Sequence, residues 1–325
     1  MIFFSIIIPT WKRKILLKEI IVKLLKQNFN YDFEIIICDS NSNDGTKKII
    51  QDLEKTTNKI KYINIIQNSL PEKRNIGIKS AKGKYIILMD DDCIPANNYF
   101  LKEYFREFNN NINKNIILNG TVSFPKDFIK KSNFIKYRQS RHFSKDRRLK
   151  LWNNELNLKH LVVMNMAFPK NQVLNKKIMF NTNFWGYGSE DHDFAQQLKS
   201  GGFVLKACAA EIIHFDKASY SSYLTKIYHF GRDGMLYLKE FNTEAYEEIF
   251  LEKITFNFLK RKIFKSILNK TLVMMIKFEK KIFFNFPIYY QVGIFLSFLL
   301  GSIDRKHSSK EIIKRKAGWY TKKYS

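Results

Sequence analysis

The sequence predicts an α/β fold whose sheet is mostly parallel and covered by helices on both faces. The chain has 325 residues, of which 45% are hydrophobic, so it can form one large core and an accessory region. Apolar, β-branched runs in the first third lack the polar alternation of a half-exposed strand, and segments of helical periodicity separate them. Buried strands that alternate with helices are typical of parallel sheets covered on both sides.

The expected elements follow one another in regular order. Strands are predicted at residues 3–9, 33–39, 60–66 and 84–90. Helices are predicted at residues 16–27, 47–54 and 74–81, with the turn Asp44-Gly45-Thr46 before the second of them. Residues 126–159 are basic and less regular, which predicts a loop region with short helices. This region is the candidate for a segment that closes over a bound ligand. A helix at residues 191–199 is expected to end at Gly201-Gly202.

Basic residues are in large excess. Lys and Arg number 56 and Asp and Glu number 30, which gives a formal net charge of +26. A surface this basic favours nucleotides, nucleic acid or an anionic membrane leaflet as partners. The three cysteines, Cys38, Cys93 and Cys208, have neither zinc nor disulfide spacing and fit a reducing compartment. Residues 1–14 begin apolar and then become basic, the reverse of a signal peptide, so they predict a first strand.

Three of the predicted strands end in polar residues. The first strand ends in Pro9-Thr10, the second in the polar stretch Cys38–Thr46, which contains Asp39, and the fourth in Asp90-Asp91-Asp92. Ligands of open α/β sheets bind outside the carboxyl ends of the strands, so these residues are candidates for a binding site. Asp39 can accept the imide N–H of a uracil there, although a structural role at the turn explains it equally well.

The acid triplet and His214 indicate a metal site. Three adjacent carboxylates repel one another unless a cation is present, and hard oxygen ligands suit Mg²⁺ or Mn²⁺ bridging a diphosphate. His214 follows an apolar strand, and a neutral imidazole there can complete the metal shell. The alternatives are a solvated acidic turn and a structural histidine. The sequence has neither a GxxxxGK[ST] loop nor a GxGxxG motif, so P-loop and Rossmann dinucleotide sites lose their main support.

The motifs resemble those of a known family. FSIIIPTWKR, EIIICDSNSNDGT and EKRNIGIKSAKGKYIILMDDD look like the nucleotide-binding half of family-2 glycosyltransferases with the GT-A fold. NMAFPK, FWGYGSEDHDF and a later histidine resemble the galactosyltransferase-type half shared by β-1,4-galactosyltransferases, the bacterial chondroitin polymerase and polypeptide N-acetylgalactosaminyltransferases. The resemblance covers residues 1–216. It implies a GT-A catalytic domain at residues 1–220, with a nucleotide- and metal-binding half (1–122) and an acceptor and catalytic half (123–220).

The resemblance also implies roles for single residues in the donor site. Asp90 and Asp92 match the two acids of the DXD motif, and Asp92 together with His214 would bind Mn²⁺ or Mg²⁺. Arg74 and Asn75 match an RN.G element of the nucleotide site. The full implied set for the nucleotide and the donor sugar is Pro9, Thr10, Asp39, Arg74, Asn75, Asp90, Asp91 and Asn165.

The stretch that contains Glu190 and Asp191 resembles the W-G-W-G-G-E-D motif of the same enzymes. There the aspartate is the catalytic base and the glutamate helps to hold the sugars. The implied sugar platform consists of Trp185, Tyr187 and Gly188; Tyr187 replaces a tryptophan but keeps an aromatic ring for the sugar face. A helix start with Ser189 as N-cap explains the acids structurally, and both explanations can hold together.

Residues 221–325 form a basic helical region in this prediction. Within it, residues 282–303 carry no charged side chain and are nominally long enough to span a bilayer. Pro287 would break or kink a helix there, which argues against a full span. Two alternatives remain open: an amphipathic or re-entrant element on an anionic membrane surface, and a buried helix packed on the catalytic domain.

The sequence therefore predicts an inverting, metal-dependent glycosyltransferase. It would move a hexose or N-acetylhexosamine from a UDP-sugar to a glycan or lipid-linked acceptor in bacterial surface polysaccharide or lipooligosaccharide synthesis. The resemblance favours galactose or N-acetylgalactosamine as the donor sugar, and glucose and N-acetylglucosamine stay open. The expected location is cytoplasmic, peripherally bound to the inner membrane. A nucleic-acid-binding protein and a non-catalytic membrane-associated scaffold are the alternatives. The acid cluster would repel phosphate without a metal, so no nucleic acid is expected as a partner.

Overall fold

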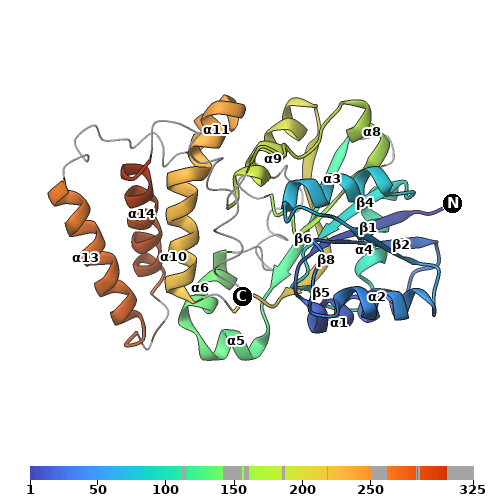
Figure 1. Cartoon of the computed structure of the whole chain (residues 1–325), viewed down its shortest axis with the longest axis horizontal. Coiled ribbons are helices and arrows are strands. Elements are labelled where there is room, and N and C mark those ends of the chain that lie inside the picture. Colours follow the sequence, from blue (N-terminus) through green and yellow to red (C-terminus); the bar gives the residue numbers. More distant parts are fainter. Residues whose placement is uncertain are drawn as a thin grey trace. The chain divides into compact units, whose positions relative to one another are not determined.

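The computed structural model describes residues 1–111, 115–141, 156, 161–184, 187–217, 219–249, 262–282, 284 and 286–305 (Figure 1). The chain divides into two compact units. The first unit comprises Met1–Ile129, Arg138–Phe180 and Gln197–Asp216; the second comprises Lys130–Tyr137, Asn181–Gln196 and Lys217–Ser325. Two short segments that precede the predicted domain boundary at residue 220 thus group with the second unit.

An eight-stranded sheet runs through the described part of the first unit. Its strands are β1 (Phe4–Thr10), β2 (Phe33–Asp39), β3 (Ile60–Asn64), β4 (Tyr85–Met89), β5 (Cys93–Pro95), β6 (Ile116–Ser123), β7 (Asn165–Pro169) and β8 (Val204–His214). They lie in the order β3-β2-β1-β4-β7-β6-β8-β5. The first four are parallel, as predicted, but β7 is antiparallel to β4 and β6, and β5 is antiparallel to β8. The sheet is therefore mixed, and its parallel part carries the predicted polar strand ends.

Helices cover both faces of the parallel strands (Figure 1). The helices α1 (Lys14–Leu25), α2 (Thr46–Glu54) and α4 (Phe100–Asn109) share one buried core with alternate residues of β1 such as Ile6. The helix α3 (Leu70–Ser80) packs against β1 and β2 through the opposite face. A Cβ atom at Gly77 would lie 2.4 Å from Cγ2 of Ile7, so this close approach depends on glycine.

Helix α3 starts earlier than the predicted residue 74. The Ser69 hydroxyl accepts a 3.4 Å hydrogen bond from the Glu72 N–H, and Pro71 occupies the first turn. This combination of a serine cap and an early proline is a common helix start. The earlier start places Lys73 inside the helix, where its side chain becomes buried.

The second unit is mainly helical. Its helices include α10 (Tyr220–His229), α11 (Met235–Phe241), α12 (Thr243–Glu247), α13 (Lys262–Glu279) and α14 (Pro287–Ile303), and a π-helical turn, η2 (Phe230–Gly234), joins α10 to α11. Helix α14 packs closely on α10: the Ser297 hydroxyl donates to the Leu224 carbonyl oxygen at 2.6 Å. A Cβ atom at Gly231 would lie 2.4 Å from the carbonyl oxygen of Phe298.

The uncharged stretch 282–303 is not one continuous helix. Pro287 occupies the first turn of α14, where its missing N–H costs nothing, instead of kinking a longer helix. One side of α14, including Tyr290 and Phe298, is buried within the second unit. Over the described residues, no helix is both long and apolar enough to cross a membrane.

Candidate active site

The ends of β1 and β2 meet because the two strands pair in parallel with Thr10 opposite Asp39. Asp39 is fully buried. Its Oδ1 accepts a 2.5 Å hydrogen bond from the Ser42 hydroxyl, and its Oδ2 accepts one of 2.8 Å from the Tyr62 hydroxyl. These bonds hold the loop that follows β2. The Ser42 N–H also donates to Oδ2 at 3.2 Å, so about one of the four carboxylate lone pairs, on Oδ1, remains for a ligand, and a structural role and the predicted uracil contact are compatible.

Lys73 lies beside the same strand ends, and its role was not predicted from the sequence. Its side chain is only 4% exposed. Its Nζ atom donates to the Thr10 carbonyl oxygen at 3.1 Å and to Asn68 Oδ1 at 2.8 Å. Burial lowers the pKa of Lys73 to about 8, against the opposing effect of nearby carboxylates. A buried ammonium group costs free energy, which is expected where it serves a ligand.

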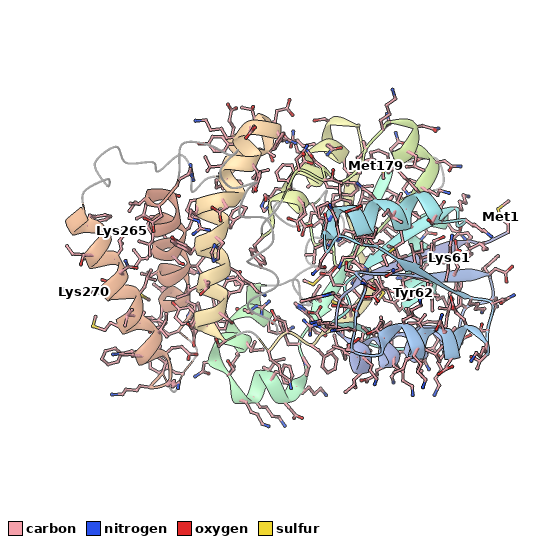
Figure 2. All side chains as sticks on the ribbon, in the orientation of Figure 1. Met1, Lys61, Tyr62, Met179, Lys265 and Lys270 are labelled. Carbon is pink, nitrogen blue, oxygen red and sulfur yellow. The ribbon has the colours of Figure 1, made fainter. Side chains whose placement is uncertain are left out.

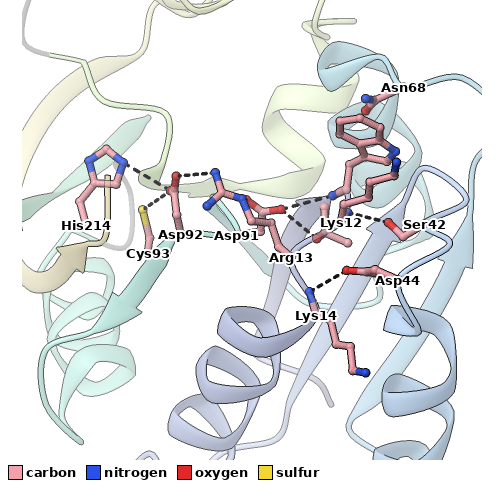
Figure 3. A network of polar contacts seen from close by, with 12 residues as sticks. Lys12, Arg13, Lys14, Ser42, Asp44, Asn68, Asp91, Asp92, Cys93 and His214 are labelled. Carbon is pink, nitrogen blue, oxygen red and sulfur yellow. Dashed lines mark hydrogen bonds and ion pairs between the residues drawn. The ribbon is translucent and has the colours of Figure 1, made fainter. Parts of the chain in front are cut away.

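Asp91 joins the end of β4 to the end of β1. Its Oδ2 accepts hydrogen bonds from the Thr10 hydroxyl at 2.8 Å and from the Trp11 N–H at 3.3 Å (Figure 3). Burial and the neighbouring charge of Asp92 raise the pKa of Asp91 to about 7. Pro9, one residue before Thr10 in β1, is also buried. Thr10 and Asp91 therefore brace the strand ends on which the candidate site is built.

Asp92 and His214 lie side by side, although they are far apart in the sequence. Strand β5 pairs antiparallel with β8 so that Cys93 is opposite His214. This register places His214 Nε2 3.4 Å from Asp92 Oδ1 (Figure 3). On the other side of Asp92, the Arg13 guanidinium approaches Oδ2 to 3.7 Å. Burial would raise the pKa of Asp92, but His214 and Arg13 stabilise the carboxylate and hold that pKa well below its usual range.

The residues at this point fit a divalent cation. One ligand atom each from Asp92, Cys93 and His214 can be chosen so that all three lie within 4.8 Å of one another. A carboxylate oxygen and an imidazole nitrogen are a suitable pair for Mn²⁺. Burial and the adjacent carboxylates raise the pKa of the Cys93 thiol well above its usual value, so Cys93 is a protonated neighbour that donates to Asp92. The Nδ1 atom of His214 is buried and has no hydrogen-bond partner in the described part of the chain.

Arg74 and Asp90 form a second charged pair at the edge of the site. Arg74 is 2% exposed, and its NH2 atom lies 3.1 Å from Asp90 Oδ1. The guanidinium also lies over the Phe180 ring, 5.1 Å from its centroid. Asn75 makes a reciprocal pair with the Phe180 backbone, donating at 2.7 Å and accepting at 3.0 Å. Both predicted nucleotide residues are therefore engaged with protein groups.

Asn165 is fully buried between strands. Its Oδ1 accepts from the Tyr104 hydroxyl at 2.7 Å, and its Nδ2 donates to the carbonyl oxygens of Thr121 and Ala210 at 2.9 and 3.0 Å. A Cβ atom at Gly120 would lie 2.2 Å from this Nδ2 atom. These bonds give Asn165 a structural role in the sheet, and its contact with a donor sugar stays a prediction.

Glu190 and Asp191 belong to the second unit, in the first turn of α9 (Ser189–Ser200). Glu190 is buried and Asp191 is half-buried. Acidic residues in a first turn interact favourably with the helix dipole. The Ser189 hydroxyl is buried and makes no hydrogen bond to any described residue, so Ser189 does not act as the expected N-cap. Of the two predicted structural roles, the interaction of the acids with the helix dipole remains.

The residues before α9 are described only in part. Gly188 adopts a φ of +81°, which favours glycine, and its carbonyl oxygen lies 2.7 Å from His192 Nδ1. Lys226 Nζ lies 5.6 Å from the centroid of the Tyr187 ring. Trp185 and half of the predicted closing loop, residues 142–155 and 157–159, lie outside the described residues.

Four residues at the site were not predicted from the sequence: Arg13, Ser42, Tyr62 and Lys73. Arg13 and Ser42 follow the polar ends of β1 and β2, so their place in the loops was a usable signal. Tyr62 lies within β3 and Lys73 within α3. Only the register of β3 against β2 and the capped start of α3 bring these two side chains to Asp39 and Thr10.

The fold is that of an α/β glycosyltransferase of the GT-A type. The family model described as Glycosyl transferase family 2 matches residues 5–177, more than half of the chain. The chain belongs to this family and is a glycosyltransferase.

Curated relatives match over part of their length. A GalNAc(5)-diNAcBac-PP-undecaprenol beta-1,3-glucosyltransferase of Campylobacter jejuni is 40% identical over 91 residues, which cover 27% of this chain and 29% of that protein. Hyaluronan synthase of Pasteurella multocida is 28% identical over 228 residues, covering 62% and 23%. Chondroitin synthase of Escherichia coli is 25% identical over 233 residues, covering 62% and 33%. The chain thus matches about a third or less of each relative's length.

Solved structures share the fold. Staphylococcus aureus TarS 1–349 superposes with a TM-score of 0.54 at 14% identity, covering 98% of this chain and 93% of that one. The mannosyltransferase PcManGT from Pyrobaculum calidifontis, in complex with GDP-Man and Mn²⁺, superposes with a TM-score of 0.58 at 13% identity, covering 92% and 85%. At these identities the likeness establishes the GT-A fold alone.

Proposed function

We propose that the chain transfers a hexose or N-acetylhexosamine from a UDP-sugar to a hydroxyl of a glycan or lipid-linked acceptor, with inversion and with Mn²⁺ or Mg²⁺ bound. The observation that carries the proposal is the pairing of Asp92 with His214, 3.4 Å apart, at the end of β4. A carboxylate and an imidazole at the carboxyl end of a parallel strand fit a metal-bound diphosphate.

The nucleotide would lie over the ends of β1 and β2. Asp39 accepts the imide N–H of the uracil, and Thr10 and Pro9 form the floor beneath the base. The buried ammonium of Lys73, 3.1 Å from the Thr10 carbonyl oxygen, supports an anionic or carbonyl-rich ligand at this place. Arg74 and Asp90 would lie beside the diphosphate. Asn75 holds the segment at Phe180 next to this pair.

The cation would be held by Asp92 and His214. When bound, it acts as a Lewis acid that stabilises the charge on the departing diphosphate. Arg13, 3.7 Å from Asp92, offsets part of the negative charge of the acid triplet. Asp91 keeps the strand ends in register through Thr10 and Trp11, so its role in the donor site is indirect.

Asp191 would take the proton from the attacking acceptor hydroxyl. One carboxylate suffices for this task because the leaving diphosphate is stabilised electrostatically and does not need a second acid to protonate it. Glu190 accepts hydrogen bonds from the sugars, and the rings of Trp185 and Tyr187 offer apolar faces to their C–H groups. Gly188, with its positive φ, allows the backbone to turn between the rings and the acids.

The resemblance favours galactose or N-acetylgalactosamine as the donor sugar. A lipid-linked acceptor is supported by one relative, whose name specifies a polyprenyl-diphosphate-linked glycan. Such an acceptor would be met at the cytoplasmic face of the inner membrane, where the strongly basic chain would associate with anionic lipid.

The test is UDP release by the purified full chain from a panel of UDP-sugars, with Mn²⁺ and with EDTA. Metal-dependent release from one sugar, abolished in Asp92→Ala, would support the donor and the cation site. If no UDP-sugar is bound or hydrolysed with any divalent metal, the proposal is wrong. With an acceptor found, NMR of the new glycosidic linkage tests inversion.

A further inference from the structure

Exposed large apolar side chains are concentrated in one region of the second unit. Thirteen such residues are exposed in the described part of the chain, and eight of them fall between Ile267 and Val292. Single exposed apolar residues are normal on soluble proteins, but a concentration of this kind marks an interaction site. The eight are Ile267, Val273, Met274, Phe278, Phe284, Phe286, Ile288 and Val292.

The outer face of α13 combines these apolar residues with lysines. Ile267, Met274 and Phe278 are 54%, 55% and 50% exposed, and their spacing of seven and four residues places them on one side of the helix. Each is followed three residues later by an exposed lysine, and these lysines are Lys270, Lys277 and Lys281. The last of them lies over its own apolar partner, with Nζ 5.5 Å from the Phe278 ring centroid.

The inner side of α13 has different partners. Lys265 points toward α14 and forms an ion pair with Asp304 at 2.6 Å, whereas Lys270 lies on the side of α13 away from α14 (Figure 2). Leu268 and Leu272 are buried in the aromatic core of this unit. The helix therefore already has a packed inner face, and its outer apolar stripe is a separate surface.

The turn between α13 and α14 continues this surface. The Tyr289 hydroxyl donates a hydrogen bond to the Met275 carbonyl oxygen, which ties the start of α14 to the last turns of α13. The rings of Phe284 and Phe286 are 5.8 Å apart and exposed, and Ile288 is exposed in the first turn of α14. The exposed stripe of α13 thus ends in an aromatic cluster.

We propose that the outer face of α13 and the α13–α14 turn form a docking surface for an anionic lipid bilayer. The apolar and aromatic side chains would enter the region between headgroups and acyl chains, and the flanking lysines would contact the lipid phosphates. This deepens the membrane association included in the proposed function by naming the surface. By contrast, one face of the uncharged helix α14 is packed against α10.

Charge complementarity favours a bilayer over a second copy of the chain. An isologous contact through this face would bring the same lysines of two copies together, and like charges at an interface cost binding energy. An anionic leaflet instead matches the lysines with negative headgroups and matches the apolar stripe with lipid chains. Binding to an anionic bilayer therefore accounts both for the lysines and for the exposed apolar residues of this surface.

The experiment is co-sedimentation of the full chain with vesicles of phosphatidylcholine alone and with added phosphatidylglycerol, without any nucleotide sugar. We expect binding to the anionic vesicles, weakened by salt, and at least about tenfold weaker binding for Ile267→Ser/Met274→Ser/Phe278→Ser and for Lys270→Glu/Lys277→Glu. The matched controls are Ile15→Ser/Ile66→Ser and Lys18→Glu/Lys48→Glu, exposed residues outside this surface, which should bind like the unaltered chain. Thermal unfolding verifies that every variant is folded.

Several results would overturn the proposal. These are equal binding to neutral and anionic vesicles, no binding to either, or α13 variants that bind like the controls. A concentration-dependent dimer that the α13 variants abolish would assign the face to a second copy. UDP release measured on the same proteins separates this proposal from the proposed function, because vesicle binding needs neither donor nor metal.

Discussion

His214 Nε2 lies 3.4 Å from Asp92 Oδ1 because β5 and β8 pair with Cys93 opposite His214. The proposed cation site therefore depends on a backbone register as much as on its side chains. Two residues separated by more than one hundred positions meet only where a three-residue strand runs antiparallel beside β8.

Removal of either member of this pair should weaken metal binding. We expect His214→Ala and Asp92→Asn to reduce Mn²⁺ affinity by at least about tenfold. Even the loss of a residue that only hydrogen-bonds to a metal ligand lowers metal affinity by about this factor. Calorimetric titration of Mn²⁺ into the protein with UDP present measures the effect. His192→Ala, an exposed histidine at α9, is the control and should keep its affinity. Unchanged Mn²⁺ affinity in both site variants would exclude this pair as the cation site.

Asp191→Asn should separate binding from transfer. The amide keeps the size and polarity of the side chain but cannot accept a proton, so kcat should fall by about 10²–10⁴ while UDP-sugar affinity stays nearly constant. Steady-state transfer to an acceptor, combined with UDP-sugar titration, measures both quantities. Glu190→Gln should raise KM more than it lowers kcat. The reverse pattern between the two variants would exchange their assigned roles.

Lys73 should make stability depend on pH in the alkaline range. Its pKa is lowered from 10.5 to about 8 in the folded protein, so between these values the unfolded chain binds more protons. Stability should therefore rise with pH in this window. Relative to Lys73→Met, the unaltered protein should gain about 2 kcal/mol of unfolding free energy between pH 7.5 and 10. Urea unfolding at several pH values measures the difference, and parallel pH profiles would show that Lys73 is not perturbed.

Asn242 should position the first turns of α9. Its Nδ2 donates to Asp193 Oδ1 at 2.8 Å, and its Oδ1 accepts from the Ala245 N–H and caps α12. Asn242→Ala leaves the buried Asp193 without this donor and should cost about 1–3 kcal/mol of stability. Because α9 carries Asp191, kcat should fall more than donor KM rises.

The charge variant Asn242→Asp tests this role further. An aspartate keeps the α12 cap but replaces the donor with a like charge beside Asp193. It should therefore lower kcat as much as alanine does while α12 remains capped. Asn110→Ala, at an exposed helix end, is the control. Full activity in Asn242→Asp would show that the contact with Asp193 does not matter for transfer.

Local signals in the sequence predicted the parallel strands well. The apolar run 33–39 coincides with β2, and Gly45, with a φ of +88°, turns into α2 as the Asp44-Gly45-Thr46 sequence predicted. The antiparallel direction of β7 was not predictable, since it depends on the long connection that precedes it. The predicted start of α3 was too late, although Ser69 as N-cap and Pro71 in the first turn are a recognisable helix start.

The candidate site was predictable where chemistry follows a strand. Asp39 and the acid triplet lie at strand ends, as expected. The burial of Lys73 was not predictable, because a helical lysine is expected to be solvent-exposed unless its packing is known. Asn165 shows the opposite problem: a residue assigned to the donor site by its motif is buried and bonded to the Tyr104 hydroxyl and to two carbonyl oxygens of the sheet.

The place of β8 in the sheet has a consequence for how the enzyme matures. Although β8 is the last strand along the described residues, it lies between β6 and β5, which are both made earlier. Until residues 204–214 have emerged and inserted, β5 lacks its neighbour and Asp92 lacks His214. Since such long-range pairing is slow, the proposed cation site should be completed late in folding. Metal binding during refolding would thus report completion of the sheet.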